Sequence, residues 1–261
     1  MTDTSLGTAL ITGASSGIGA TYADRLARRG YDIVLVARDE ARMASLAERL
    51  RRETGVAIDV QPADLTEKHD LARIEQRLRE DERIVLLVNN AGATAPGGFA
   101  APDLDAQDRL IRLNVTAVTR LAGAVVPRFL AQGGAIVNIA SVLALVPELP
   151  LGIYAATKSF VLTFSQSLQA ELGPRGLYVQ AVLPSATRTE FWMRSGRDVD
   201  ALQGAMDVGE LVDAALIGFD RRETVTIPPL PDETQWESFL AARRAMAPNF
   251  GNAHPAARYR A

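Results

Sequence analysis

Cysteine is absent from this chain of 261 residues, so neither a disulfide bond nor a zinc site with thiolate ligands can form. Histidine occurs twice, at His69 and His254, and the two residues lie far apart in the sequence. They suggest no metal cluster, and we therefore expect no metal in the chemistry of this protein. Lysine is equally scarce, because Lys68 and Lys158 are the only two lysines in the chain.

Long apolar runs are also missing. A helix that spans a membrane needs roughly 20 consecutive apolar residues. The most apolar stretch, 134–157, is interrupted by Pro147, Glu148, Pro150 and Gly152. The segment 1–7 contains neither a basic residue nor an apolar core, so it does not resemble a secretory signal. The sequence therefore predicts a cytoplasmic protein.

Charge of one sign is not in large excess. The net charge is −3, which gives no electrostatic reason to expect a nucleic-acid partner. Hydrophobic residues make up 48% of the chain and charged residues 23%, which is typical of a folded globular protein and not of a disordered one. We therefore expect a folded protein that binds neither nucleic acid nor membranes.

Short β-branched runs alternate with longer amphipathic stretches. The runs lack polar alternation, as expected for strands buried on both faces. The predicted strands are 8–12, 31–37, 56–61, 84–89, 135–140, 177–183 and 225–227. The predicted helices between them are 17–29, 39–54, 66–80, 105–131 and 155–172. Repeated β-α-β units predict an α/β fold, a doubly wound parallel sheet of about seven strands with helices on both faces.

The chain shows no linker and no internal repeat, so we expect a single domain over 1–261 that both binds a dinucleotide and carries the catalytic residues. The segment 188–261 has a less regular pattern, and four prolines would interrupt any long helix there. They are Pro228, Pro229, Pro231 and Pro248. This segment is predicted to close over the substrate side of the sheet as part of the same domain.

The first predicted strand leads into the sequence T-G-A-S-S-G-I-G at 12–19, which is followed by a helix. Glycines allow a tight turn and a close approach of backbone N–H groups to a pyrophosphate, which then faces the positive end of the helix dipole. An ordinary tight turn is the alternative. The position between strand and helix favours dinucleotide binding. The predicted cofactor-binding residues here are Gly13, Ser15, Ser16, Gly17, Ile18 and Gly19.

The spacing T-G-x-x-x-G-I-G resembles the short-chain dehydrogenase/reductase family, in its short, unextended branch. The resemblance covers about residues 9 to 227 and implies a Rossmann-type sheet that binds NAD or NADP. An NAD enzyme usually has a carboxylate at the end of the second strand. Ala37 occupies that position here, and the guanidinium of Arg38 after it could bind the 2′-phosphate of NADP. Asp39 is the alternative, which would favour NAD, but it is also the expected N-cap of the next helix.

Two further motifs match the cofactor site of this family. Asp64 and Leu65 follow the third strand, where an aspartate of the family binds the adenine amino group; a turn aspartate is the alternative. The N-N-A-G signature at 89–92 ends the fourth strand, and the resemblance implies that Asn90, Ala91 and Gly92 line the cofactor.

Tyr154 and Lys158 form a Y-x-x-x-K motif on a predicted helix, so their side chains share one face. Ser141 precedes Tyr154 at the spacing of the family's substrate-orienting serine, and Asn114 matches its helix asparagine. A tyrosine with its ordinary pKa of about 10 is a poor acid–base catalyst near neutral pH. A nearby ammonium group and the oxidised nicotinamide would lower this pKa.

The resemblance implies a role for each of these four residues. Tyr154 would transfer the proton, and Ser141 would donate a hydrogen bond that polarises the substrate carbonyl. Lys158 would hold the nicotinamide ribose, and Asn114 would anchor a water molecule that links Lys158 to solvent. The protein is therefore predicted to move a hydride between NADP(H) and a small carbonyl or alcohol substrate. A non-catalytic NADP sensor on the same fold is the alternative.

After the sixth strand the family usually has proline-glycine, whereas Ser185 follows Pro184 in this chain. A position that needs positive φ would strain a serine. Thr187 and Thr189 are still predicted to contact the carboxamide and the phosphates of the cofactor.

Apolar loop residues beside the predicted site suggest an apolar substrate. The predicted substrate contacts are Ser141, Leu143, Leu149 and Trp192. The resemblance also implies a homodimer or homotetramer, because helices equivalent to 105–131 and 155–172 commonly pair across a two-fold axis in this family.

Overall fold

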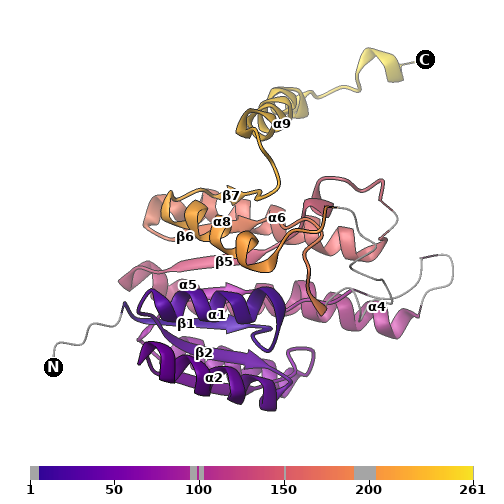
Figure 1. The fold of residues 1–261 in the computed structure, drawn as a ribbon. Coiled ribbons are helices and arrows are strands. Elements are labelled where there is room, and N and C mark those ends of the chain that lie inside the picture. Colours follow the sequence, from indigo (N-terminus) through magenta and orange to yellow (C-terminus); the bar gives the residue numbers. More distant parts are fainter. Residues whose placement is uncertain (1–5, 95–98, 100–102, 150, 191–203, 261) are drawn as a thin grey trace. The chain divides into compact units, whose positions relative to one another are not determined.

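A computed structural model describes residues 6–94, 99, 103–149, 151–190 and 204–260 of the chain. Its centre is one parallel sheet with the strand order β3-β2-β1-β4-β5-β6-β7 (Figure 1). The strands are β1 (Thr8–Thr12), β2 (Asp32–Ala37), β3 (Ile58–Pro62), β4 (Ile84–Asn89), β5 (Ala135–Ile139), β6 (Tyr178–Val182) and β7 (Val225–Thr226). The prediction of a doubly wound parallel sheet of seven strands is confirmed.

Helices cover both faces of this sheet (Figure 1). One face packs against α1 (Gly17–Arg28), α2 (Glu40–Thr54) and α8 (Val208–Asp220). The other packs against α3 (Lys68–Glu80), α5 (Val118–Gln132) and the end of α6 (Ile153–Leu172). Helix α4 (Leu104–Ile111) continues through a π-helical turn, Arg112–Ala117, into α5.

The strands are apolar throughout because both of their faces are buried. In β1 the side chains of Ala9 and Ile11 belong to the core beneath α1 and α2, whereas Leu10 belongs to the core beneath α3 and α5. All three are fully buried. A strand that buries alternate residues in two different cores shows no polar alternation. This continuous apolar pattern is what made the strands recognisable in the sequence.

The strand order fixes where a ligand can bind. Strand β1 lies between β2 and β4, and the chain winds outward from it in both directions. The point where the strand order reverses is called the switch point. In such sheets the connections that leave the strands on either side of it run in opposite directions, which leaves a crevice at the carboxyl ends of the strands. The loops that follow β1 and β4 therefore form the walls of a site.

The helical stretch Leu104–Gln132 is long and apolar enough to cross a membrane by length and composition. However, 44% of its most apolar window is buried within the fold. Leu121, Val125 and Phe129 are almost fully buried in the core that α5 shares with α3. These apolar side chains therefore already have packing partners in the core.

The chain divides into two compact units, Met1–Pro228 and Pro229–Ala261. The second contains α9 (Glu233–Met246) and two short 3-10 turns, Ala247–Gly251 and Ala257–Tyr259. Helices α8 and α9 were not predicted from the sequence. Where the structure describes the segment 188–261, that segment is more regular than expected. The prolines explain why α9 was not predicted. They were expected to interrupt a helix, but Pro231 precedes α9 and Pro248 follows it. The prediction that both units form a single domain stays a prediction.

Candidate active site

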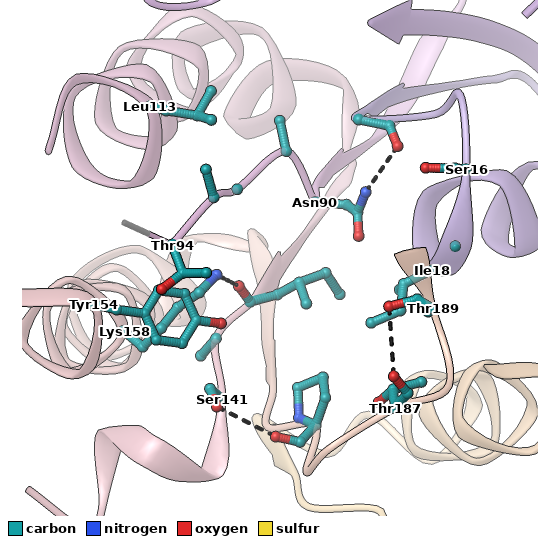
Figure 2. Close-up of a pocket in the computed structure, with 18 of the residues that line it drawn as sticks. Ser16, Ile18, Asn90, Thr94, Leu113, Ser141, Tyr154, Lys158, Thr187 and Thr189 are labelled. Atoms are coloured by element: carbon teal, nitrogen blue, oxygen red, sulfur yellow. Dashed lines mark hydrogen bonds between the residues drawn. The ribbon is translucent and has the colours of Figure 1, made fainter. Parts of the chain in front are cut away.

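A cavity of about 590 Å³ opens at the carboxyl ends of the central strands. Its size is that of sites for cofactors and small substrates. The walls come from the loops after strands β1 to β6 together with the first turns of α6. Figure 2 shows the side chains of Tyr154, Lys158 and Ser141 on one side of this cavity and Ser16, Ile18 and Thr189 on another.

Two glycines have no room for a side chain: Gly13 in the loop after β1 and Gly19 in the first turn of α1. A Cβ atom on Gly13 would lie 2.8 Å from Asn90 Nδ2, and one on Gly19 would lie 2.4 Å from both that atom and the carbonyl oxygen of Gly13. Asn90 Nδ2 also donates to the carbonyl oxygens of Thr12 at 2.9 Å and Gly13 at 3.2 Å. The loop is thus packed directly onto the neighbouring loop, with its backbone exposed to the cavity.

Helix α1 begins at the wall of the cavity. Its N-cap residue Ser16 is extended, and its hydroxyl makes no capping hydrogen bond to the helix. The first N–H groups of a helix have no acceptor within the helix, and together with the dipole they attract anions. Gly17 adopts φ +54°, and Ser15 and Ile18 also line the cavity. This cradle of glycine and helix N-terminus fits a dinucleotide pyrophosphate.

The far end of the cavity is charged and partly exposed. The Arg38 side chain is 72% exposed, and its Nη1 lies 3.8 Å from Asp64 Oδ2. Asp64 accepts hydrogen bonds from the backbone N–H and the hydroxyl of Thr66. Asp39 accepts one from the backbone N–H of Arg42 at 3.0 Å and so caps α2, which is the role that the sequence suggested. Arg38 therefore has its guanidinium available to a ligand phosphate, while Asp39 is engaged in its helix.

Tyr154 and Lys158 lie one turn apart near the start of α6, and both are buried. The Lys158 ammonium donates to the carbonyl oxygen of Ile139 at 2.8 Å and lies 5.7 Å from the centre of the Tyr154 ring. Ser141 directly follows the carboxyl end of β5, where its Oγ contacts the carbonyl oxygen of Pro184 and accepts from the N–H of Leu143. The sequence-predicted triad of serine, tyrosine and lysine is thus brought together (Figure 2).

Burial changes the acid–base properties of this group. It raises the pKa of Tyr154 above its ordinary value, while a hydrogen bond with Ser141 acts in the opposite direction. Burial also lowers the pKa of Lys158 from 10.5 to about 8. The sequence-based expectation of a lowered tyrosine pKa depended on an ammonium and an oxidised nicotinamide; in the protein alone, desolvation dominates and favours the neutral phenol.

Asn114 lies in the π-helical turn between α4 and α5. Its Nδ2 donates to the carbonyl oxygen of Ala93 at 2.9 Å and to Thr157 Oγ1 at 3.0 Å, and its Oδ1 accepts from the N–H of Ala93 at 3.0 Å. A Cβ atom on Gly92 would lie 3.4 Å from both Asn114 Oδ1 and Lys158 Nζ. Asn114 therefore lies behind the cavity wall and connects the loop after β4 to the residue before Lys158.

Comparison with known proteins gives the family. The profile described as short chain dehydrogenase matches residues 7–200. The chain belongs to this family of oxidoreductases. A short-chain dehydrogenase from Sphingobium yanoikuyae, solved in complex with NADPH, is 58% identical, with a TM-score of 0.96 over 98% of this chain and 100% of that chain.

Two further relatives are similar over most of this chain. A bulky-bulky ketone specific alcohol dehydrogenase from Comamonas testosteroni is 56% identical, with a TM-score of 0.91 over 98% of this chain and 99% of that chain. An uncharacterized oxidoreductase of Staphylococcus saprophyticus is 30% identical over 221 residues, which cover 84% of this chain and 93% of the relative.

The other predicted site residues of this short-chain dehydrogenase have the following positions. Those that line the cavity are Leu65, Ala91, Gly92, Leu143, Leu149, Pro184, Thr187 and Thr189. Gly19 packs beneath the loop after β1, and Trp192 lies outside the described residues. Ser185 is not strained, because Arg222 is the only described non-glycine residue with positive φ.

Sequence reasoning missed several residues that line the same cavity. They include Ala93, Thr94, Leu113, Val142 and Leu151. Ala93 and Thr94 continue the loop that N-N-A-G begins, so that motif could have indicated them. Leu151 contributes its side chain to a small apolar cluster around Leu143 and Tyr154, which only the folded chain brings together.

The lowered pKa of Lys158 predicts how stability depends on pH. Between pH 8 and 10.5 the unfolded chain binds a proton at Lys158 that the folded chain has lost, so the free energy of unfolding rises with pH in this window. Relative to Lys158→Met, the wild type should gain about 3 kcal/mol across the window and show no such gain below pH 8. Urea unfolding of both cofactor-free proteins at several pH values measures this difference. Parallel pH profiles for the two proteins would contradict the assignment.

Proposed function

We propose that this short-chain dehydrogenase is a cytoplasmic enzyme that transfers a hydride between NADP(H) and an apolar carbonyl or alcohol substrate. The observation that carries the proposal is the meeting of Ser141, Tyr154 and Lys158 at one wall of a cavity whose other walls include a pyrophosphate cradle. A cavity with that cradle alone would suit a non-catalytic binder equally well. The buried tyrosine and lysine add acid–base chemistry that a binder does not need.

The proposed chemistry follows from the properties of these side chains. A bound nicotinamide cofactor would supply the hydride in the reducing direction. Ser141 would donate a hydrogen bond to the substrate carbonyl, and Tyr154 would deliver its proton to the same oxygen. Because burial keeps the Tyr154 phenol protonated, a proton is available at neutral pH. Lys158, whose pKa is about 8, can return a proton to the tyrosine through a solvent path that a water anchored by Asn114 would complete.

Each region of the cavity has a proposed part in holding the cofactor. The pyrophosphate would bind at the backbone of Gly13–Ile18, and the adenine would lie beside Asp64 and Leu65. The nicotinamide half would contact Asn90–Gly92, Tyr154, Lys158, Pro184, Thr187 and Thr189. All of these residues except Ala14 line the cavity.

Arg38 supports NADP as the proposed cofactor, with NAD as the alternative. Its exposed guanidinium at the adenosine end can form charge-assisted hydrogen bonds to a 2′-phosphate. Asp39, the carboxylate that NAD binding would use, caps α2. The Sphingobium relative, 58% identical, was solved in complex with NADPH.

Replacing Arg38 tests the choice of cofactor. Arg38→Ala should weaken NADPH binding by about 10- to 100-fold, as expected for loss of a hydrogen bond to a charged group. NADH binding should change by less than about twofold, because NADH has no 2′-phosphate. Titration of nicotinamide fluorescence measures both affinities. Arg42→Ala, one turn further on in α2, is the matched control. A wild type that prefers NADH would exclude the proposed role of Arg38.

Replacing Tyr154 tests the proposed acid–base role. Tyr154→Phe should lower kcat by about 10²- to 10⁴-fold, because the phenylalanine has no proton to transfer. NADPH affinity should remain within about twofold, since the ring still fills the same volume. Tyr259→Phe, an exposed tyrosine outside the cavity, is the control. If turnover by Tyr154→Phe equals that of the control, Tyr154 is not the proton donor.

The substrate end of the cavity supports an apolar substrate with bulk on both sides of the carbonyl. Leu143, Leu149, Leu151 and Val142 line the cavity together with the catalytic tyrosine. The Comamonas relative, 56% identical, is a bulky-bulky ketone specific alcohol dehydrogenase. Each methylene group moved from water into an apolar wall contributes about 0.8 kcal/mol.

A ketone panel tests this substrate class. An aryl ketone with a four-carbon alkyl chain should be reduced with a kcat/KM at least about 100-fold higher than acetone, because its extra carbons contact the apolar wall. Leu149→Ser should reduce this preference by about fivefold, since Leu149 is half exposed. Initial rates with NADPH give both values. Equal kcat/KM for the two ketones would contradict an apolar substrate wall.

The helical stretch Leu104–Gln132, which begins with α4, and helix α6 support a homodimer or homotetramer, as the family resemblance implied. Helices α4 and α6 carry exposed apolar side chains that one chain leaves uncovered. They are Leu104, Ile111 and Phe160. We propose that these helices pair between subunits, and that neither nucleic acid nor a membrane is a partner.

A further inference from the structure

The C-terminal unit Pro229–Ala261 has no core of its own. Helix α9 contains no buried residue, and between 231 and 260 only Trp236 and Leu240 are partly covered. A segment of this size buries too little apolar surface to stabilise itself, and an isolated helix of this length is marginal in water. A regular helix here therefore needs an external surface to pack against.

The sequence of α9 is nevertheless well suited to a helix. Asp232 caps it by accepting from the N–H of Thr234 at 2.9 Å and from its hydroxyl at 2.7 Å. Glu233 lies in the first turn and Arg243 and Arg244 in the last, which complements the helix dipole. These features stabilise a helix locally and do not depend on the remainder of the chain.

One face of α9 is apolar except for Arg243, which lies on the same face at i+4 from Phe239 and i+3 from Leu240. Trp236, Phe239, Leu240 and Met246 recur at helical spacing, and we call them the α9 seam. The Trp236 and Phe239 rings are stacked with their centres 5.3 Å apart, and Phe239 and Met246 are about half exposed. Small residues such as Ala241 lie on the opposite face. An amphipathic helix with an exposed apolar face is typical of an interface.

The charges of α9 point to a particular partner. Its N-terminal half carries Glu233 and Glu237, and its C-terminal half carries Arg243 and Arg244. Two such helices in antiparallel orientation place the acidic half of each beside the basic half of the other, whereas a parallel pair places like charges together. Antiparallel pairing about a two-fold axis joins identical surfaces, so α9 is complementary to itself.

We propose that α9 is a dimerisation arm, in which the α9 seam packs against the α9 seam of a second copy of this chain in antiparallel orientation. The arm lies beyond residues 7–200, which match the family profile, and the match to the Staphylococcus relative covers only 84% of this chain. The match to the Sphingobium chain covers 98%, so it includes most of the arm.

A charge in the seam should separate the two copies. Phe239→Glu places a carboxylate in the proposed contact. The molar mass from size-exclusion chromatography with light scattering should fall to half that of the wild type, from a tetramer to the dimer that the pairing of α4 and α6 would still hold together. Ala241→Glu, two residues along on the opposite face, should keep the wild-type mass. NADPH binding should be the same in both variants, because the cavity lies in the other unit. A wild type that runs as a monomer, or an unchanged mass for Phe239→Glu, would overturn the proposal.

Charge reversal tests whether α9 packs against the α9 of a second copy of this chain or against another surface. Glu233→Arg/Glu237→Arg makes both halves basic, and Arg243→Glu/Arg244→Glu makes both halves acidic. Each variant alone should dimerise about tenfold more weakly at low salt because like charges then oppose each other. An equimolar mixture of the two should recover the wild-type mass, because each α9 then pairs with an α9 of opposite charge. Docking on the same chain, on another protein or on lipid predicts no recovery on mixing, and that result would exclude the antiparallel pair.

Discussion

The contact between Thr12 and Asn90 fastens the ends of β1 and β4 together, and the active site depends on it. The Thr12 hydroxyl accepts from the backbone N–H groups of both Asn90 and Ala91 at 3.0 Å, while Asn90 Nδ2 donates back to the Thr12 carbonyl. At the switch point of a doubly wound sheet the adjacent loops diverge, and this contact holds them in register. Beyond the backbone pairing of β1 with β4, this contact fixes the pyrophosphate cradle against the loop that contacts Asn114.

This contact also explains which glycines the loop after β1 requires. Gly13 and Gly19 are next to the Asn90 amide, so any side chain there would displace it. Gly13 and Gly17 both have a positive φ, and Gly17 lies near Thr189. A single sequence motif thus meets two separate physical demands, close packing against β4 and a turn into α1. This is why the motif, placed between a strand and a helix, was enough to predict a dinucleotide-binding loop.

The sequence predicted the sheet well because each strand is buried on both faces, and β1 and β4 were predicted with the observed bounds. It predicted that Ser141, Tyr154 and Lys158 lie close together, and the fold brings all three to one wall of the cavity. It did not predict α8 and α9, because the prolines near α9 were read as interruptions. Nor could it indicate the π-helical turn at Asn114, which the hydrogen bonds of that side chain to Ala93 and Thr157 accompany.

The direction of the Tyr154 pKa shift could not be predicted from the sequence, for a different reason. Neighbouring charges can be inferred from a motif, but burial depends on the complete fold. Tyr154 is buried among Leu143, Leu151 and Ala155, which belong to two different elements and a loop. The same burial that excludes water from the site therefore raises the pKa of its tyrosine and lowers that of its lysine.

The cavity changes in character along its length, and this orients any ligand within it. At one end Arg38 and Asp64 are charged and partly solvated, so a phosphate there retains water and gains a guanidinium. At the other end Tyr154 and Lys158 are buried beside apolar side chains, where an uncharged group is preferred and each hydrogen bond is stronger. In the proposed binding mode a 2′-phosphate lies beside Arg38 and the nicotinamide beside Tyr154, so each half of the cofactor meets the part of the cavity that suits its charge.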